Sequence, residues 1–290
     1  MKLSVVVPVL NERASLPATV AALRSCRGIS EIILSDGGST DGTLPWLQAQ
    51  SDIVLVKSLR GKGPQINAGA VAAFAVNPAT ATAESAGAAS AFDVPGASAI
   101  SETDATQTAA TETAPAQTAA AETAAPGASS NVLLFLHADC LISQPAIDAL
   151  HAALADPQLA GGAFYLRFAE SRPRSLRFVA WGINLRARLR GSATGDQGIF
   201  VRQAVFQSIG GAPDWPLFED VELVRRIRRA GKFTVLRTPV TVSGRRYIEH
   251  GVFRTALLIY FLRFAYWLGV PPHRLKNWFR DARGMNKRPS

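Results

Sequence analysis

The sequence predicts an α/β protein with a mostly parallel central sheet flanked by helices, and two observations lead to this prediction. Short apolar runs alternate with segments of helical spacing along most of the chain. In addition, the apolar runs at 32–34 and 134–136 stop abruptly, and the carboxylates Asp36 and Asp139 follow them. A short apolar run bounded by glycines is typical of a buried strand in a parallel sheet. Strands that alternate with helices at this spacing form right-handed crossovers.

The elements are expected in the following order. The run Leu-Ser-Val-Val-Val-Pro-Val at 3–9 predicts the first strand, and apolar residues at helical spacing over 16–23 predict the first helix. We expect the arginine-rich segment that runs to Arg190 to be a connection. Further strands are expected at 31–35, 53–56, 132–136 and 162–168, and further helices at 43–50, 65–74, 145–155 and 220–230.

The net charge of +9 is unevenly distributed along the chain. Residues 75–130 contain acidic residues but no lysine or arginine, so the rest of the chain is strongly basic. Such a surplus attracts the phosphates of nucleic acids, nucleotide sugars or anionic lipids. We find no helix-turn-helix, zinc-finger or aromatic RNA-binding signature, and we therefore expect no nucleic-acid partner.

The number of cysteines and the first residues of the chain indicate in which cellular compartment the protein is expected. Two cysteines, Cys26 and Cys140, are too few for a disulfide framework or a zinc cluster. Lys2 leads directly into the first strand without a signal cleavage site. We expect a cytoplasmic protein.

Residues 75–130 interrupt the pattern of strands and helices. They are dominated by Ala, Thr, Ser, Glu and Pro, and contain too little hydrophobic material to offset the entropy of ordering. We predict a disordered insert that joins the sheet at the edge opposite the carboxylates. The predicted organisation is one α/β domain at 1–74 and 131–250, this insert, and an apolar and basic C-terminal helical tail at 251–290.

The tail contains an almost wholly apolar stretch, residues 252–268, interrupted by Arg254 and Arg263. This stretch is short and poorly composed for a transmembrane span. Our first expectation is that it packs on the core. The alternative is a peripheral position on the inner face of the cell membrane, with basic residues of the tail on anionic headgroups.

Polar residues follow the first two predicted strands. Asn11 and Glu12 come after strand 3–9, and Asp36 ends strand 31–35 before two glycines. Ligands of open α/β sheets bind at the carboxyl edge, so we predict that Asp36 and Asp139 lie side by side in one cleft. Asp36 can accept a hydrogen bond from a uracil or guanine ring or from ribose hydroxyls. Asn11 could instead cap the next helix, but its place beside the acids favours the cleft.

A third group of candidates follows strand 53–56. Lys62, Gln65 and Asn67 lie in and after a turn that contains Gly61 and Gly63. A lysine here could meet a phosphate as a point charge, although a solvated lysine is nearly as good an interpretation.

Asp139 is the predicted metal ligand. A carboxylate at a sheet edge suits Mg²⁺ or Mn²⁺, which would neutralise a departing diphosphate. His137 could be a second ligand, but we favour a buried packing role. For Cys140, a small buried residue is the default interpretation.

Three acids open the predicted helix at 220–230. Carboxylates in a first turn complement the helix dipole, which would be a purely structural role. The apolar approach Trp215-Pro216-Leu217-Phe218 could, however, hold an acid in a partly dry cleft, where it accepts a proton from a hydroxyl. We select Asp220 as that base and Glu219 as the reserve.

Taken together, these segments resemble the family 2 glycosyltransferases, which have the Rossmann-like GT-A fold. The resemblance covers about 2–74 and 131–250, and His137-Ala138-Asp139 is most similar to small bacterial transferases with a Leu-His-Ala-Asp metal motif. The motifs that carry it are Pro8-Val9-Leu10-Asn11-Glu12, Asp36-Gly37-Gly38-Ser39-Thr40-Asp41-Gly42-Thr43, Asn67-Ala68-Gly69-Ala70, His137-Ala138-Asp139 and Glu219-Asp220.

The resemblance implies inverting transfer from a nucleoside-diphosphate sugar to a hydroxyl or carboxyl acceptor. It assigns the metal and diphosphate to Asp139, the general base to Asp220 and the acceptor side to Gln197 and Glu219. Arg202 would support the helix that holds the base. The implied donor-binding set is Pro8, Asn11, Glu12, Asp36, Lys62, Gln65, Asn67 and Ala138.

Two other functions are weighed against this one. A sugar-phosphate nucleotidyltransferase needs a basic glycine-rich loop after the first strand, where this chain has Asn11-Glu12-Arg13. A non-catalytic nucleotide-sugar-binding protein would lack the base or the metal acid, and this chain has both. The aromatic residues of the tail suggest a lipid or carotenoid-like acceptor, but they could equally close the core.

Overall fold

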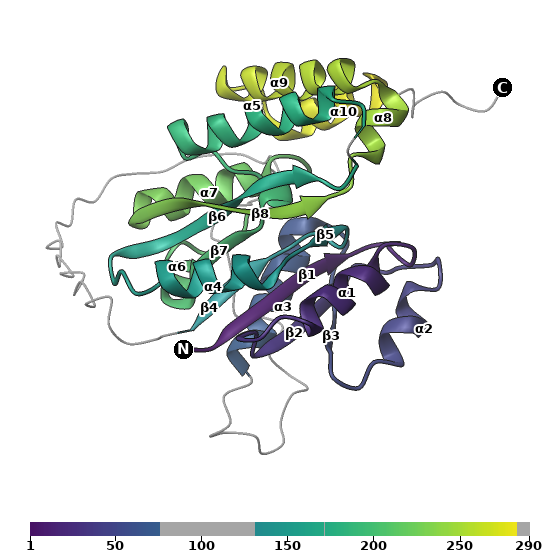
Figure 1. Ribbon diagram of the computed structural model, residues 1–290. Helices are drawn as coiled ribbons and strands as arrows, with labels where there is room; N and C mark the ends of the chain where they lie inside the picture. Colours follow the sequence, from purple (N-terminus) through teal and green to yellow (C-terminus); the bar gives the residue numbers. More distant parts are fainter. Residues whose placement is uncertain (76–130, 171, 283–290) are drawn as a thin grey trace, which may run out of the picture. The chain divides into compact units, whose positions relative to one another are not determined.

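The fold is built on a mixed eight-stranded sheet with the strand order β3-β2-β1-β4-β7-β6-β8-β5 (Figure 1). The computed structural model describes residues 1–75, 131–170 and 172–282, all of which belong to one unit. The predicted insert therefore lies outside the described residues. The strands are β1 (Leu3–Val9), β2 (Glu31–Asp36), β3 (Val54–Lys57), β4 (Val132–Phe135), β5 (Cys140–Leu141), β6 (Leu159–Phe168), β7 (Ile199–Arg202) and β8 (Lys232–Val242).

Strand direction decides which segments meet at the functional edge of the sheet. β1 pairs in parallel with both β2 and β4, so the carboxyl ends of these strands share one edge. β7 pairs antiparallel with β4, with Ile199 opposite Phe135, so the segment that enters β7 arrives at that same edge. Val242, at the end of β8, lies opposite Cys140.

Helices cover both faces of the sheet and bury continuous apolar cores. One core joins α1, α4 and α5 to the sheet, and the other joins α3, α6 and α7 to its opposite face. This arrangement confirms the predicted α/β class. The helices are α1 (Leu16–Arg24), α2 (Thr43–Gln48), α3 (Lys62–Ala75), α4 (Gln144–Ala153), α5 (Ser175–Arg190), α6 (Gln203–Ser208), α7 (Glu219–Ala230), α8 (Arg245–His250), α9 (Val252–Trp267) and α10 (Pro272–Ala282).

The segment before Arg190 is a helix, and the prediction of a connection there is wrong. Leu176, Val179, Ile183 and Ala187 recur at intervals of three and four residues along α5, and all four are buried. This spacing is the signature of a helix that buries one face. The arginines between these residues obscured the pattern.

The C-terminal helices pack on the rest of the fold, which confirms the first expectation for the apolar tail. Leu262 and Ala265 of α9 form a small core with Phe218 and with Leu275 of α10. Figure 1 shows α5, α9 and α10 gathered together at the top of the view. Within the described part of the chain, no helix is both long enough and apolar enough to cross a membrane.

Candidate functional site

A cavity of about 230 Å³ lies at the sheet edge where β4 and β8 end and α7 begins. Chain segments far apart in sequence supply its polar side chains, because the strand directions bring them to one edge. Helices α8, α9 and α10 supply the opposite wall. The charged residues that line the cavity are Lys62, His137, Asp139, Asp196, Glu219, Asp220, Arg246 and Arg263.

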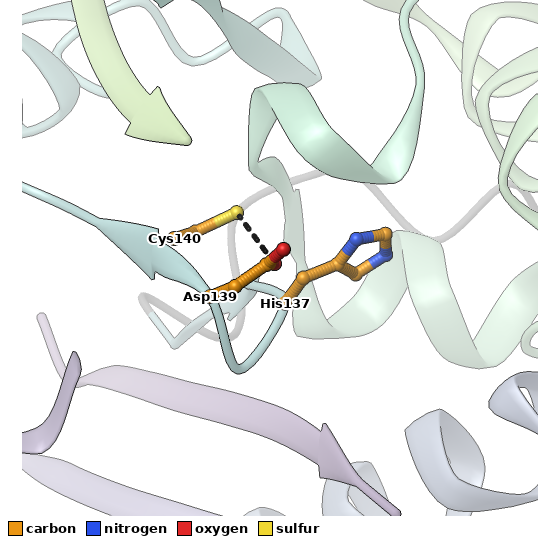
Figure 2. Close-up of side chains that lie close together, drawn as sticks. All are labelled: His137, Asp139 and Cys140. Atoms are coloured by element: carbon orange, nitrogen blue, oxygen red, sulfur yellow. Dashed lines mark hydrogen bonds between the residues drawn. The ribbon is translucent and has the colours of Figure 1, made fainter. Parts of the chain in front are cut away.

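The turn after β4 carries three adjacent groups able to bind a metal. Ligand atoms of His137, Asp139 and Cys140 all lie within 4.8 Å of one another. Figure 2 shows the Asp139 carboxylate between the other two side chains, with the His137 ring extending away from it. Cys140 is buried, and burial, followed by the charges of Asp196 and Asp139, raises the pKa of its thiol well above the ordinary value. Sulfur ligands suit soft metals, so for a hard cation such as Mg²⁺ or Mn²⁺ the set reduces to Asp139 and His137.

His137 lines the cavity, and the expectation that it packs in the core is wrong. Its Nδ1 lies 2.7 Å from Oδ1 of Asp196, and its Nε2 lies 3.3 Å from Nζ of Lys62. An ammonium group can only donate, so Nε2 accepts and the Nδ1–H donates to Asp196. The lone pair of Nε2 therefore accepts from Lys62, so a metal could bind at Nε2 only in place of that hydrogen bond.

Opposite charges around His137 support this protonation pattern. Desolvation alone would raise the pKa of Asp196, but the hydrogen bond with His137 and the charges of Lys62 and Arg246 lower it well below its ordinary value. Desolvation would lower the pKa of Lys62, yet the carboxylates of Glu219, Asp196 and Asp220 raise it. At neutral pH, Asp196 is therefore ionised and Lys62 is protonated.

A short 3₁₀ turn, Gly195–Gln197, forms the floor beside His137. A Cβ on Gly195 would lie 2.4 Å from Nε2 of His137, so only glycine allows this close approach. Gln197 is fully buried, and its amide bonds the backbone of Phe164 and Thr194. The prediction that Gln197 lines the acceptor side is therefore corrected: it caps the turn.

Asp220 is fixed by the backbone. Its Oδ2 accepts from the N–H of Gly195 at 2.6 Å, and its Oδ1 accepts from the N–H of Val221 at 2.7 Å. Phe218, just before the acids, has a left-handed φ of 64°, a strained conformation for a bulky residue. Strain of this kind persists only where the surrounding structure holds it, here through the packing of Phe218 on Tyr266 and Leu262.

Glu219 is the other acid at the start of α7. Its side chain is only 8% exposed, and its Oε1 lies 3.9 Å from Nζ of Lys62. Burial, and then the charge of Asp220, raises its pKa above the ordinary value of 4.5. The two neighbouring acids thus occupy different environments, one hydrogen-bonded by the backbone and one desolvated.

This environment predicts a pH dependence of stability. A carboxyl group with a raised pKa in the fold binds more protons there than in the unfolded chain, so its contribution to stability falls as pH rises above 4.5 and through the raised pKa. Glu219→Gln removes this titration. We therefore expect the free energy of unfolding of the variant, relative to the unaltered chain, to increase between pH 4 and pH 8. Denaturant unfolding at each pH measures it, and a difference that shrinks with pH would contradict the assignment.

The residues at the ends of β1 and β2 do not line the cavity. β1 separates β2 from β4, so the prediction that Asp36 and Asp139 lie side by side is wrong. Asp36 is buried and accepts from the N–H groups of Gly38 and Ser39, thereby holding the glycine turn. Asn11 does not cap α1: its Oδ1 accepts from the N–H of Thr40 at 2.8 Å.

Several other predicted donor-binding residues hold the scaffold. Gln65 is buried and donates to the carbonyls of Val9 and Ser35, which ties β1 to β2. Asn67 exchanges two hydrogen bonds with Ala212, and the carbonyl of Ala138 accepts from Thr19. None of the three lines the cavity, and their predicted contacts with the donor stay predictions. The guanidinium of Arg202 does not reach α7; its bonds go to carbonyls of Leu154, Asp156 and Leu159.

The remaining predicted residues stay accessible to a ligand. Lys62 begins α3 with half of its side chain exposed. Pro8 and Glu12 are partly exposed at and just beyond the end of β1, and Asn11 is exposed. These four side chains therefore retain surface at the carboxyl edge of the sheet.

Comparisons with known proteins gave one family match and a set of similar folds. The family described as "Glycosyl transferase family 2" matches residues 4–75. Comparison with curated proteins gave no match. Among solved structures, S. aureus TarS 1-349 in complex with UDP is similar, with a TM-score of 0.51 and 14% identity. The match covers 89% of this chain and 65% of that one, so the chain spans a little under two thirds of the TarS fragment.

Two further structures are similar over most of this chain. The mannosyltransferase PcManGT from Pyrobaculum calidifontis, in complex with GDP-Man and Mn²⁺, has a TM-score of 0.53 at 17% identity and covers 95% of this chain and 67% of its own. Glucosyl-3-phosphoglycerate synthase from Mycobacterium tuberculosis, with Mn²⁺, UDP and glucosyl-3-phosphoglycerate, has a TM-score of 0.53 at 16% identity and covers 93% and 81%.

The chain has the GT-A glycosyltransferase fold. The resemblance to glycosyltransferase family 2 is confirmed over residues 4–75. Within this GT-A fold, sequence reasoning missed Asp196, Arg246 and Arg263 as cavity residues. Asp196 directly follows Gly195 in the sequence, but no sequence pattern indicated that its side chain would bond to His137. The two arginines belong to C-terminal segments that no short motif marks.

Proposed function

We propose that the protein transfers a sugar from a nucleoside-diphosphate sugar to an acceptor hydroxyl or carboxyl group, with inversion at the anomeric carbon. One observation carries the proposal: a single cavity gathers Asp139, His137, Lys62, Glu219 and Asp220. It thus combines a metal-binding carboxylate, a phosphate-binding cation and a candidate base. PcManGT was crystallised with GDP-Man and Mn²⁺ on this fold, which supports the choice of donor.

Asp139 and His137 fit a divalent cation of the Mg²⁺ or Mn²⁺ type. The Asp139 carboxylate is the kind of ligand that Mg²⁺ and Mn²⁺ prefer, and these hard cations disfavour the sulfur of Cys140. His137 could join Asp139 if its Nε2 gave up the hydrogen bond with Lys62. When bound, such a cation neutralises charge on the departing diphosphate. The Lys62 ammonium, 3.3 Å from His137 Nε2, is placed to add a second positive charge there.

The nucleoside end of the donor is assigned to the ends of β1 and β2. Pro8, Asn11 and Glu12 are accessible there. Asp36 already accepts three hydrogen bonds from its own turn, so it binds base or ribose only through remaining lone pairs or after the turn adjusts. Gln65 contributes by holding the two strand ends together.

Asp220 is the proposed general base. The acceptor oxygen forms a bond to the anomeric carbon while the bond from that carbon to the diphosphate oxygen breaks. The acceptor proton passes to the Asp220 carboxylate, and the nucleoside diphosphate leaves. A single displacement needs one base and inverts the anomeric carbon, whereas retention by double displacement needs a nucleophile as well. The two backbone N–H bonds hold Asp220 in one orientation for this step.

Slow donor hydrolysis tests the proposed reaction without knowledge of the acceptor. The protein is incubated with UDP-, GDP-, CDP- and dTDP-sugars and Mn²⁺, and the freed sugar is followed by proton NMR. We expect one nucleotide series to release nucleoside diphosphate, with the inverted anomer appearing first. The retained anomer first would overturn inversion, and no release from any donor would favour the non-catalytic binding protein.

We also propose that the protein contacts an anionic membrane surface through an aromatic face on α5, α9 and α10. Large side chains stay exposed on these contacting helices, and rings of neighbouring residues stack on one another. Exposed apolar patches of this kind mark interaction sites, and nearby arginines suit anionic headgroups. The aromatic face consists of Phe178, Trp181, Phe253, Tyr260, Phe261, Phe264, Trp267 and Trp278.

Sedimentation with vesicles tests the membrane contact. We expect binding to phosphatidylglycerol vesicles, weaker binding to phosphatidylcholine vesicles, and loss of most binding in the Phe264→Ser/Trp267→Ser variant. Leu59→Ser is the control, because Leu59 is 79% exposed outside these three helices. Equal binding by both variants would contradict the proposal.

A further inference from the structure

The acceptor side of the cavity contains a cationic group that the proposed reaction does not use. Arg263 of α9 lines the cavity together with Asp220. Its Nη2 donates to Oγ of Ser192 at 2.5 Å, but its buried Nη1 has no hydrogen-bond partner among the residues that the structure describes. A buried guanidinium nitrogen without a partner is costly, because it has lost its bond to water.

A second arginine meets the same serine. Nε of Arg186 on α5 donates to the carbonyl oxygen of Ser192 at 3.3 Å. Across the described ranges 1–75, 131–170 and 172–282, neither Arg186 nor Arg263 forms an ion pair with a carboxylate. Burial, and then the charge of Arg186, lowers the pKa of Arg263 to about 10, which still leaves it charged at neutral pH. Two desolvated positive charges therefore lie side by side.

Arg246 of α8 is the second arginine that lines the cavity. Its side chain is exposed, and it forms no ion pair within the part of the chain that the structure describes. The carboxylates of the cavity come from the turn after β4, the 3₁₀ turn and α7, whereas Arg246 and Arg263 come from the C-terminal helices. The cavity therefore combines carboxylates, Lys62 and His137 from one set of segments with two arginines from the C-terminal helices.

We propose that Arg263, together with Arg246 on the lining of the same cavity, binds an anionic group on the acceptor, so that the acceptor is a small hydroxylated carboxylate or phosphate. This inference rests on the proposed function. Asp220 and Arg263 line the same cavity, so an anion held by Arg263 would direct a neighbouring hydroxyl toward the base. The same cavity contains the proposed diphosphate site, so only part of its volume of about 230 Å³ is left for the acceptor, which favours a small headgroup over a bulky apolar one. Guanidinium groups bind carboxylates and phosphates through paired hydrogen bonds.

Titration calorimetry on the full chain tests this inference with glycerol 3-phosphate, glycerol and inorganic phosphate as probes. Saturating nucleoside diphosphate and Mn²⁺ are present to fill the proposed diphosphate site. We expect glycerol 3-phosphate and phosphate to bind and glycerol not to bind. Arg263→Gln should weaken glycerol 3-phosphate binding on the order of tenfold or more. Arg188→Gln is the control, because Arg188 is exposed on α5 outside the cavity.

A second variant and a second probe separate the possible outcomes of this experiment. Arg246→Gln changes an exposed side chain, so it should fold normally and weaken the same binding several-fold even if Arg263→Gln unfolds. Phosphatidylglycerol vesicles replace glycerol 3-phosphate in one arm, and binding to them alone, lost in Arg246→Gln, would assign the anion to a lipid headgroup.

Unchanged affinity in both variants, or no binding of any anionic probe, would overturn the inference. A variant that loses nucleoside diphosphate binding instead would assign the arginines to the donor. Failure of the unaltered chain to bind any nucleoside diphosphate would refute the proposed function separately.

Discussion

Asp220→Asn is expected to lower the rate of sugar transfer about a hundredfold or more while leaving donor binding unchanged. An amide has the shape of the carboxylate but cannot accept the acceptor proton, and positioned bases typically contribute factors of this size. The two backbone N–H groups of Gly195 and Val221 bond the carboxylate now, and one of them would face the amide nitrogen in the variant. Initial rates of donor turnover, with binding measured separately, give the two quantities.

Two variants control the Asp220 experiment. Asp148→Asn changes an exposed acid on α4, outside the cavity, and should leave turnover unaltered. Glu219→Gln should cost less than Asp220→Asn, since Glu219 is the reserve base. If Glu219→Gln abolishes turnover and Asp220→Asn does not, the base is Glu219.

Asp139→Asn is expected to remove the metal dependence of donor binding. The neutral amide is a much weaker ligand for Mg²⁺ or Mn²⁺ than the carboxylate, which these cations prefer. We expect nucleoside diphosphate affinity in Mn²⁺ to fall on the order of a hundredfold, toward the level measured in EDTA. Calorimetric titrations with Mn²⁺ and with EDTA measure this difference.

Cys140→Ser is the matched comparison for Asp139→Asn. The thiol is adjacent to Asp139 and within the same group of possible ligands. Because Mn²⁺ prefers oxygen ligands to sulfur, replacement of the thiol should leave the Mn²⁺ effect in place. An equal loss in Cys140→Ser would show that a thiolate ligand takes part and that a softer metal such as zinc occupies the site.

The ends of β1, β2, β3, β4 and β6 were predictable from the sequence because apolar runs stop where these strands stop, whereas β5, β7 and β8 were not predicted. β1 spans Leu3–Val9, as predicted, and Glu219 and Asp220 of α7 line the cavity as expected. These features depend on local pattern: buried strands need apolar side chains, and polar residues after them mark the carboxyl edge of the sheet. The fold could be identified because several such segments follow one another along the chain in the expected order.

What the sequence did not reveal depends on contacts between distant residues. Gln65 and Gln197 have the same side chain types as ligand-binding residues, but both are buried and bond the backbone. His137 was expected in the core because its partner, Asp196, lies 59 residues away. Helix α5 was obscured by its arginines, although its buried residues had helical spacing.

The environments of Glu219 and Asp220 also depend on contacts between distant residues. Nothing in Glu219-Asp220 indicates which acid the backbone holds and which is desolvated. The N–H of Gly195 reaches Asp220 only because β7 runs antiparallel to β4 and brings the preceding turn to the site. The chemistry of each acid is therefore set by tertiary structure.

A thermal-shift screen with UDP, GDP, CDP and dTDP sugars, each with Mn²⁺ and with EDTA, tests the central claim of a metal-dependent nucleotide-sugar site most directly. We predict that one nucleotide series raises the melting temperature in Mn²⁺, that EDTA abolishes the shift, and that Asp139→Asn behaves as the unaltered chain does in EDTA. No shift with any nucleotide sugar, from protein shown to be folded by circular dichroism, would contradict the proposed donor site.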